Sequence, residues 1–232
     1  MPVFELPTDK IIFPHPSLAE ENGLLAVGGD LKPERLLQAY ANGIFPWYSE
    51  GEPVLWWSIN PRMVLFPEEF KVSKSLRRLI RKQKFEVTLN YNFTGVISHC
   101  ASVPRFNQEG TWITKDMIQA YENLHESGYA HSFESWYDNQ LVGGLYGVSI
   151  GKAFFGESMF HTMSDASKVA FYYFIFHLRS AGFYLVDAQL YTDHLASLGA
   201  RLIGRDEYLQ KLYKAVKSKL PSKAFWEPKK YV

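Results

Sequence analysis

The chain has 232 residues, a net charge of +1 and one cysteine, Cys100. This length suffices for one large domain or two unequal ones, and a lone cysteine excludes an internal disulfide and fits a reducing compartment. No run of about 18 apolar residues occurs, and no basic region followed by an apolar stretch opens the sequence, so we expect neither a membrane-spanning helix nor a secretory signal. These features predict a cytoplasmic protein.

The first 62 residues are rich in proline, glycine and aromatic side chains. The stretch KPERLLQAYANG predicts a helix, with Pro33 near its start and Gly43 past its end. PVLWWSI, residues 53–59, reads as a strand. This part is too small for a robust core of its own, so we expect it to pack on the remainder of the chain.

The stretch KVSKSLRRLIRKQK, residues 71–84, holds seven Lys or Arg and no acid. Its apolar residues follow a helical spacing, which predicts a helix with its cations mostly on the outer face. Such a face is commonly just solvated, but here no acid is available as an i,i+4 partner. A phosphate backbone would supply the missing negative charge.

The remaining sequence alternates between strand and helix patterns. FEVTLNY predicts a strand, NFTGVISHCAS a short helix, and residues 114–127 a helix with Thr114 as N-cap and Gly128 as its stop. HSFESWY, QLVGGLYGV and AFFGESMF then predict three antiparallel strands, followed by a long apolar helix over 165–182, the strand FYLVDAQL and a short helix at 193–200. We therefore expect a mixed α+β architecture.

This order of elements is similar to that of the GCN5-related N-acetyltransferase (GNAT) fold, and the similarity is one of element order alone. Members of that fold use a glycine-rich loop after the fourth strand to cradle the pyrophosphate of coenzyme A. The corresponding segment, ESMFHTMSDASK, has no glycine that would let backbone and phosphate approach closely. If the fold is right, the donor is not expected to be coenzyme A.

Polar residues interrupt two of the predicted strands. In FYLVDAQL, alternation places Leu185, Asp187 and Gln189 on one face, and in AFFGESMF it places Phe155, Glu157 and Met159 on one face. If the strands are neighbours, Glu157 faces Asp187 and Gln189 across an apolar floor, which is typical of a ligand pocket. From the strand pattern alone, capping of nearby backbone is the favoured interpretation of Asp187 and Gln189.

Tryptophans form the next group of candidates. Trp47 and Trp112 lie in glycine-flanked loops, where stacking sites for a nucleobase tend to occur. Core packing is the ordinary alternative for a tryptophan beside proline or leucine. Because adjacent strand residues point to opposite faces, at most one of Trp56 and Trp57 can face a given pocket.

The chain contains a series of short motifs, which are NGLLAVGGDL, YANGIFPWYS, PVLWWSINPR, EGTWIT, HESGYAHS, LVGGLYGV, FFGESMF and LVDAQLYTDHLASLGA. Through their order and spacing, the chain resembles the bacterial leucyl/phenylalanyl-tRNA–protein transferase family. The resemblance runs from about residue 10 to the C-terminal FWEP. It implies a small N-terminal α+β domain over residues 1–63 and a GNAT-like catalytic domain over 64–232, with neither metal nor bound cofactor. It also implies transfer of Leu or Phe, and also Met, from aminoacyl-tRNA to proteins that begin with Lys or Arg, which makes an N-degron for protein degradation.

The resemblance also implies roles for individual residues. Asp187 and Gln189 match the catalytic pair and Glu157 another polar site residue, which we expect to bind the ammonium of either the donor or the acceptor. Trp47 and Trp112 match the sandwich for the terminal adenosine, and the donor side-chain pocket comprises Leu145, Phe154, Met159 and Phe174. The cations expected to grip tRNA phosphates are Lys71, Lys74, Arg77, Arg78, Arg81 and Lys82.

Two other functions share some of these features. An acyl-coenzyme A-dependent N-acyltransferase would have the same fold but another donor, and the missing pyrophosphate loop argues against it. A non-enzymatic RNA-binding module would use the tryptophan loops and the basic helix alone. It predicts that Asp187→Ala leaves all function intact.

Overall fold

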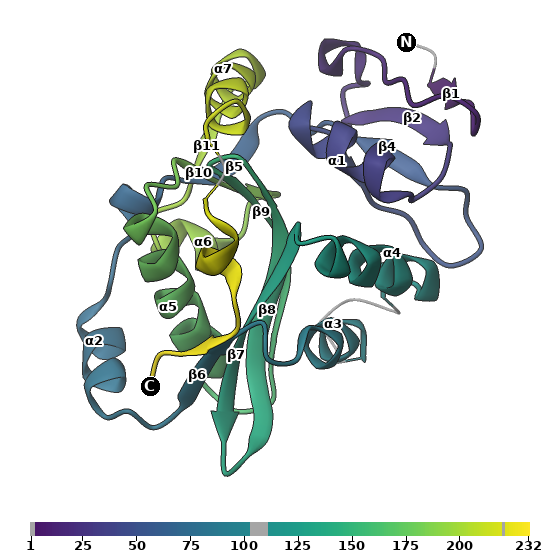
Figure 1. Ribbon diagram of the computed structural model, residues 1–232. Helices are drawn as coiled ribbons and strands as arrows, with labels where there is room; N and C mark the ends of the chain where they lie inside the picture. Colours follow the sequence, from purple (N-terminus) through teal and green to yellow (C-terminus); the bar gives the residue numbers. More distant parts are fainter. Residues whose placement is uncertain (1–2, 103–110, 220) are drawn as a thin grey trace.

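Two sheets organise this computed structural model, which describes residues 3–102, 111–219 and 221–232 (Figure 1). The smaller sheet has the strand order β1-β2-β4-β3. Its strands are β1 (Phe4–Leu6), β2 (Leu24–Gly28), β3 (Phe45–Pro46) and β4 (Leu55–Trp57). The turn η1 (Pro16–Leu18) precedes β2, and α1 (Pro33–Ala41) connects β2 to β3.

The larger sheet has eight strands in the order β11-β5-β10-β9-β8-β7-β6-β12. Its strands are β5 (Arg62–Leu65), β6 (Glu86–Leu89), β7 (Ala130–Tyr137), β8 (Gln140–Ile150), β9 (Ala153–His161), β10 (Leu185–Gln189), β11 (Arg201–Ile203) and β12 (Lys229–Lys230). Neighbouring strands run antiparallel, except that β9 and β10 pair in parallel. The sheet begins just before the predicted boundary at residue 63, so the division into 1–63 and 64–232 stays a prediction.

Helices cover both faces of this sheet (Figure 1). On one face lie α3 (Phe93–Ser102) and α4 (Lys115–Glu126), and on the other lie α2 (Lys74–Arg81) and the long α5 (Ala166–Ser180). The remaining elements are η2 (Pro67–Glu69), α6 (Asp193–Ser197), α7 (Arg205–Val216) and η3 (Lys223–Trp226). In the part of the chain that the structure describes, no helix is both long and apolar enough to cross a membrane.

The two largest hydrophobic clusters of the described residues lie on opposite faces of the sheet, because successive strand residues point to opposite faces. On β8, Tyr146 packs with α3, α4 and the N-terminal sheet, whereas its neighbour Leu145 packs with α5. We call the α5 side the α5 core. Mixed α+β architecture is confirmed.

Several predicted element ends are confirmed. The Thr114 hydroxyl accepts a hydrogen bond from the Met117 N–H at the start of α4. Gly128, just past the end of that helix, has φ +79°, the left-handed conformation that glycine adopts without a Cβ clash. The predicted turn between β7 and β8 consists of Asp138 and Asn139, both with positive φ, as a tight two-residue hairpin requires.

The parallel strands β9 and β10 separate part-way along their length. They pair at Leu185–Ala153, Val186–Phe154 and Asp187–Phe155, and the pairing ends there. Beyond this point β9 carries a bulge at residues 156–158, and β10 ends at Gln189, whose φ is +55°. Strand divergence opens a space in the middle of the sheet, and the candidate site lies there.

Candidate functional site

A cavity of about 550 Å³ lies where β9 and β10 diverge. This volume falls in the range of sites for small molecules. Aromatic and aliphatic side chains form most of its wall, and Glu157, Asp187 and Gln189 supply polar groups. The apolar lining includes Phe45, Leu65, Leu145, Phe154, Met159, Phe171, Phe174 and Val186.

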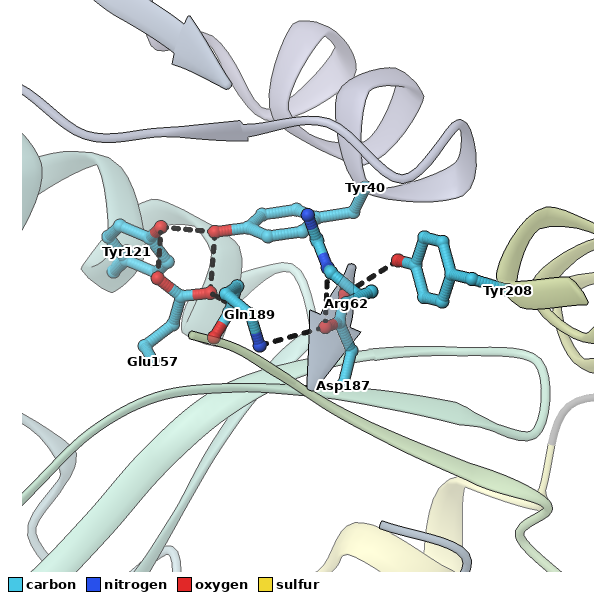
Figure 2. Close-up of polar contacts among 7 residues, drawn as sticks. All are labelled: Tyr40, Arg62, Tyr121, Glu157, Asp187, Gln189 and Tyr208. Carbon is cyan, nitrogen blue, oxygen red and sulfur yellow. Dashed lines mark hydrogen bonds and ion pairs between the residues drawn. The ribbon is translucent and has the colours of Figure 1, made fainter. Parts of the chain in front are cut away.

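Glu157 stands on the bulge of β9 and is held by two tyrosines (Figure 2). The Tyr40 hydroxyl donates to Glu157 Oε1 at 2.7 Å and the Tyr121 hydroxyl to Oε2 at 2.9 Å. The two hydroxyls also contact each other. Tyr40 comes from α1 and Tyr121 from α4, so three separate elements meet at this carboxylate.

The environment of Glu157 raises the pKa of its carboxyl group toward neutral pH. Burial raises the pKa of Glu157 to about 7, while the hydrogen bonds from Tyr40 and Tyr121 act in the opposite direction. Burial also raises the pKa of both tyrosines, so their hydroxyls stay protonated and available as donors. A carboxylate that titrates near pH 7 inside a pocket is suited to general acid–base chemistry.

Asp187 is fully buried and pairs with Arg62, which is also fully buried. Arg62 Nε lies 2.9 Å from Asp187 Oδ1, and Arg62 Nη2 lies 2.8 Å from Oδ2, a bidentate geometry. The Tyr208 hydroxyl donates to Oδ2 at 2.6 Å. Burial opposes the charge of Arg62, but the facing carboxylate outweighs it and holds the pKa of Arg62 above its usual value.

The remaining acceptor position of Asp187 goes to Gln189. The backbone N–H of Gln189 donates to Asp187 Oδ1 at 3.0 Å, so each carboxylate oxygen accepts two hydrogen bonds. A carboxylate with four donors has its capacity filled and cannot take a proton without releasing a partner. Asp187 instead fixes the left-handed turn that directs the Gln189 side chain, whose Nε2 lies 3.5 Å from Glu157 Oε1.

The cavity also brings together the predicted substrate residues. Trp47 and Trp112, which are 65 positions apart in sequence, both line it and are half-buried. Trp56 and Trp57 do not line it: Trp56 lies in the core, and the Trp57 indole N–H donates to the Trp47 carbonyl at 2.6 Å. All four residues predicted for the donor side chain are in the wall, namely Leu145, Phe154, Met159 and Phe174.

Comparison with known proteins identifies the family. Its sequence model, described as leucyl/phenylalanyl-tRNA protein transferase, matches residues 64–213, and the model of the N-terminal domain of the same family matches residues 29–59. The chain belongs to this family. Proteins named leucyl/phenylalanyl-tRNA–protein transferase are 56% identical in Syntrophus aciditrophicus and 54% identical in Nitrosospira multiformis. The alignments cover 89% and 91% of this chain and 87% and 91% of those proteins.

Among solved structures, "The structure of L-PGS from Bacillus licheniformis" aligns over 82% of this chain and 64% of that chain, at 10% identity. The TM-score of this alignment is 0.39.

One expectation about strand faces is wrong for this member of the family. Simple alternation placed Phe155, Glu157 and Met159 on one face. The bulge on β9 shifts the register between Tyr146–Ser158 and Gly147–Gly156, so that Glu157 has no partner on β8. Phe155 consequently packs in the cluster beside α1, whereas Met159 packs in the α5 core.

The predicted phosphate-binding cations surround α2. Six cations, Lys71, Lys74, Arg77, Arg78, Arg81 and Lys82, are exposed. Within the described residues none of the six forms an ion pair. By contrast, exposed Arg179, Arg201 and Lys230 are each paired with a glutamate. The α2 surface is therefore an uncompensated positive patch next to α5, which also lines the cavity.

Four residues of the two polar clusters were not predicted from the sequence: Arg62, Tyr40, Tyr121 and Tyr208. A weak signal existed for Tyr121, because it lies on the apolar face of α4 with Met117 and Leu124, at helical spacing. A tyrosine on a core face needs a partner for its hydroxyl. No local pattern links Arg62 to a carboxylate 125 residues away. Among the described residues, no His, Cys, Asp or Glu cluster is arranged to hold a metal ion.

Proposed function

We propose that this protein transfers Leu, Phe or Met from aminoacyl-tRNA to the N-terminal Lys or Arg of acceptor proteins, which makes an N-degron. The observation that carries the proposal is the apolar cavity with Gln189 and Glu157 at its edge and two tryptophans in its wall. Family membership supports the same reaction.

The donor is already an activated ester, so the protein needs no nucleophile of its own. The acceptor α-amine attacks the ester carbonyl carbon and the new C–N bond forms. The bond to the ribose oxygen of the tRNA then breaks. One proton leaves the amine and one joins the departing ribose oxygen, which gives an amide and a free tRNA end. Because an α-amine has a pKa of about 7.7–8.0, an appreciable fraction of the acceptor amine is unprotonated at the pH of a cell.

In this proposal Gln189 orients the attacking amine and Glu157 accepts its proton. Asp187 is a positioning residue, because its four hydrogen-bond donors leave it no capacity for a proton. Glu157 is the better acceptor, since burial raises its pKa to about 7, close to that of the amine.

The cavity wall supplies the donor site. We assign the donor side chain to the slot formed by Leu145, Phe154, Met159 and Phe174, and the terminal adenine to Trp47 and Trp112. Aromatic stacking holds a base with little dependence on sequence. We assign a GNAT-like fold to the catalytic part, and the glycine-free segment 157–168 favours an aminoacyl ester over coenzyme A as donor.

One assay tests the proposed function. Purified protein is incubated with Leu-tRNA and peptides that differ only at their first residue. We expect transfer to Arg- and Lys-initiated peptides and loss of transfer in Asp187→Ala and Gln189→Ala. Folded protein that transfers nothing would contradict the proposal. Protection from unfolding by a coenzyme A ester would instead favour the acyl-coenzyme A reaction, and full function in Asp187→Ala the RNA-binding module.

Salt dependence tests the α2 patch. We expect Arg77→Gln/Arg78→Gln/Arg81→Gln to weaken aminoacyl-tRNA binding and to reduce the slope of log affinity against log salt by about 2 to 3, because each phosphate contact contributes about 0.9. The matched control changes three ion-paired cations, Arg179, Arg201 and Lys230, to Gln. An equal loss of slope in both variants would mean that α2 has no special part in binding.

A further inference from the structure

The far side of the donor slot is closed by the C-terminal segment, residues 221–232. In Figure 1 this yellow segment runs beside α5 over the sheet. Its strand β12 pairs with β6, and the Asn90 side-chain amide donates to the Trp226 carbonyl at 2.7 Å. The segment is therefore tied to the sheet at two points, one at the end of η3 and one at β12.

Two aromatic rings stand between the slot and this segment. Phe154 from β9 and Phe174 from α5 both line the cavity, and their ring centroids are 4.6 Å apart. The Trp226 ring lies 6.1 Å from the Phe154 ring, and Trp226 itself is absent from the cavity wall. Among the ring contacts of Trp226, which are His131, Phe154, His177, Phe183 and Phe225, Phe154 is the one that lines the slot.

Trp226 is itself held firmly. Its ring stacks on His131 with centroids 3.8 Å apart and planes 4° from parallel. It also meets Phe183 and His177 edge-on, at 5.8 and 5.1 Å. Because protein interiors are close-packed, Phe154 cannot retreat from the slot while this indole occupies the space behind it.

We infer that Trp226 is a specificity-determining residue that limits the depth of the donor slot by holding Phe154 in place. This inference rests on the proposed function, which assigns the donor side chain to the slot. A smaller side chain at 226 leaves space into which Phe154 moves, so the slot deepens. A deeper slot favours the longer Phe side chain and leaves Leu with fewer contacts.

The test compares Trp226→Leu with wild type in the full-length protein. We expect the ratio of kcat/KM for Phe-tRNA to that for Leu-tRNA to rise about 10-fold, the lower end of the discrimination available from pocket size. A crystal structure of the variant is expected to show the Phe154 ring displaced toward position 226 and a larger cavity. An unchanged or lower ratio, or an unmoved Phe154 ring, would overturn the inference.

The matched control is Trp136→Leu. Trp136 is half-buried on β7, its indole N–H donates to Thr88 Oγ1 at 2.8 Å, and it does not line the cavity. Its loss is expected to lower stability without changing the ratio. If Trp226→Leu does not fold, Trp226→Phe keeps a ring on His131, and the ratio is expected to rise by a smaller factor. The crystallographic result requires no activity, so it stands or falls separately from the proposed function.

Discussion

Changing Asp187 to Leu and Arg62 to Met together is expected to give a protein that is more stable than either single variant but inactive. Both side chains are fully buried, so either single change leaves one group without its ionic partner. Breaking a buried pair in this way costs about 3–5 kcal/mol, whereas replacing both partners is often close to neutral. The free energy of unfolding from urea titrations measures these differences.

Activity follows a different pattern across the same variants. Gln189 keeps its left-handed backbone because its N–H donates to Asp187 Oδ1. Without that carboxylate the Gln189 side chain loses its fixed direction. We therefore expect transfer to fall by about 100-fold or more in both Asp187→Leu, which has no acceptor atom, and the double variant, a typical effect for misplaced reacting groups. An active double variant would show that Asp187 does not position Gln189.

The Asp30–Arg35 pair provides the matched control. Arg35 is fully buried, and its Nε lies 3.2 Å from Asp30 Oδ1. Neither residue lines the cavity. Asp30→Asn is expected to lower the free energy of unfolding while the folded protein keeps its transfer rate.

Glu157 is expected to determine how transfer depends on pH. The carboxylate form accepts the proton, so titration of Glu157 at about 7 is expected to add a rise in kcat/KM for the acceptor peptide, below the rise that the acceptor amine itself gives at about 7.7–8.0. Glu157→Gln removes the rise at about 7, leaves that of the acceptor amine, and lowers kcat/KM by about 100-fold or more, as is usual for loss of a general base.

Tyr40→Phe separates this titration from that of the acceptor amine. The Tyr40 hydroxyl stabilises the charged form of Glu157, so its loss raises the pKa of that carboxyl. The rise in kcat/KM is then expected about one pH unit higher, because a hydrogen bond to a charged group contributes about 1.5–3 kcal/mol and one unit corresponds to 1.36 kcal/mol.

The acceptor amine is the same in every variant, so its own titration cannot move. Tyr129→Phe, a change outside both polar clusters, is expected to leave the pH profile unchanged. A profile that does not shift in Tyr40→Phe would exclude Glu157 as the titrating group.

The parts of this fold that sequence predicts are the local ones. The helix from Pro33, the N-cap at Thr114 and the hairpin turn at Asp138–Asn139 depend on neighbouring residues, and all are confirmed. On β10 the register shifts between Asp187 and Gln189, so simple alternation does not extend to Gln189, although both residues line the cavity as predicted.

The long-range parts were beyond sequence analysis. Arg62 reaches Asp187 because β5 lies beside β10, and no local pattern determines that strand order. The bulge at Glu157 adds one residue to β9, which moves Met159 to the other face. The tyrosine pair depends on how two helices, α1 and α4, pack on each other. These features depend on tertiary packing. The residues that form them can be seen in the sequence, but their proximity in space cannot.

The tyrosine pair has a consequence for attempts to dissect this molecule. Tyr40 precedes the larger sheet in the chain, yet its hydroxyl binds the carboxylate on β9. Phe45 and Trp47, from the same early segment, form part of the cavity wall. A fragment that begins after the first sixty residues therefore lacks part of the cavity wall and one of the two hydroxyls that bind Glu157. In chimeras between family members, the N-terminal segment and the larger sheet should come from the same parent. Otherwise the side chains that contact Glu157 and line the cavity are not matched to each other.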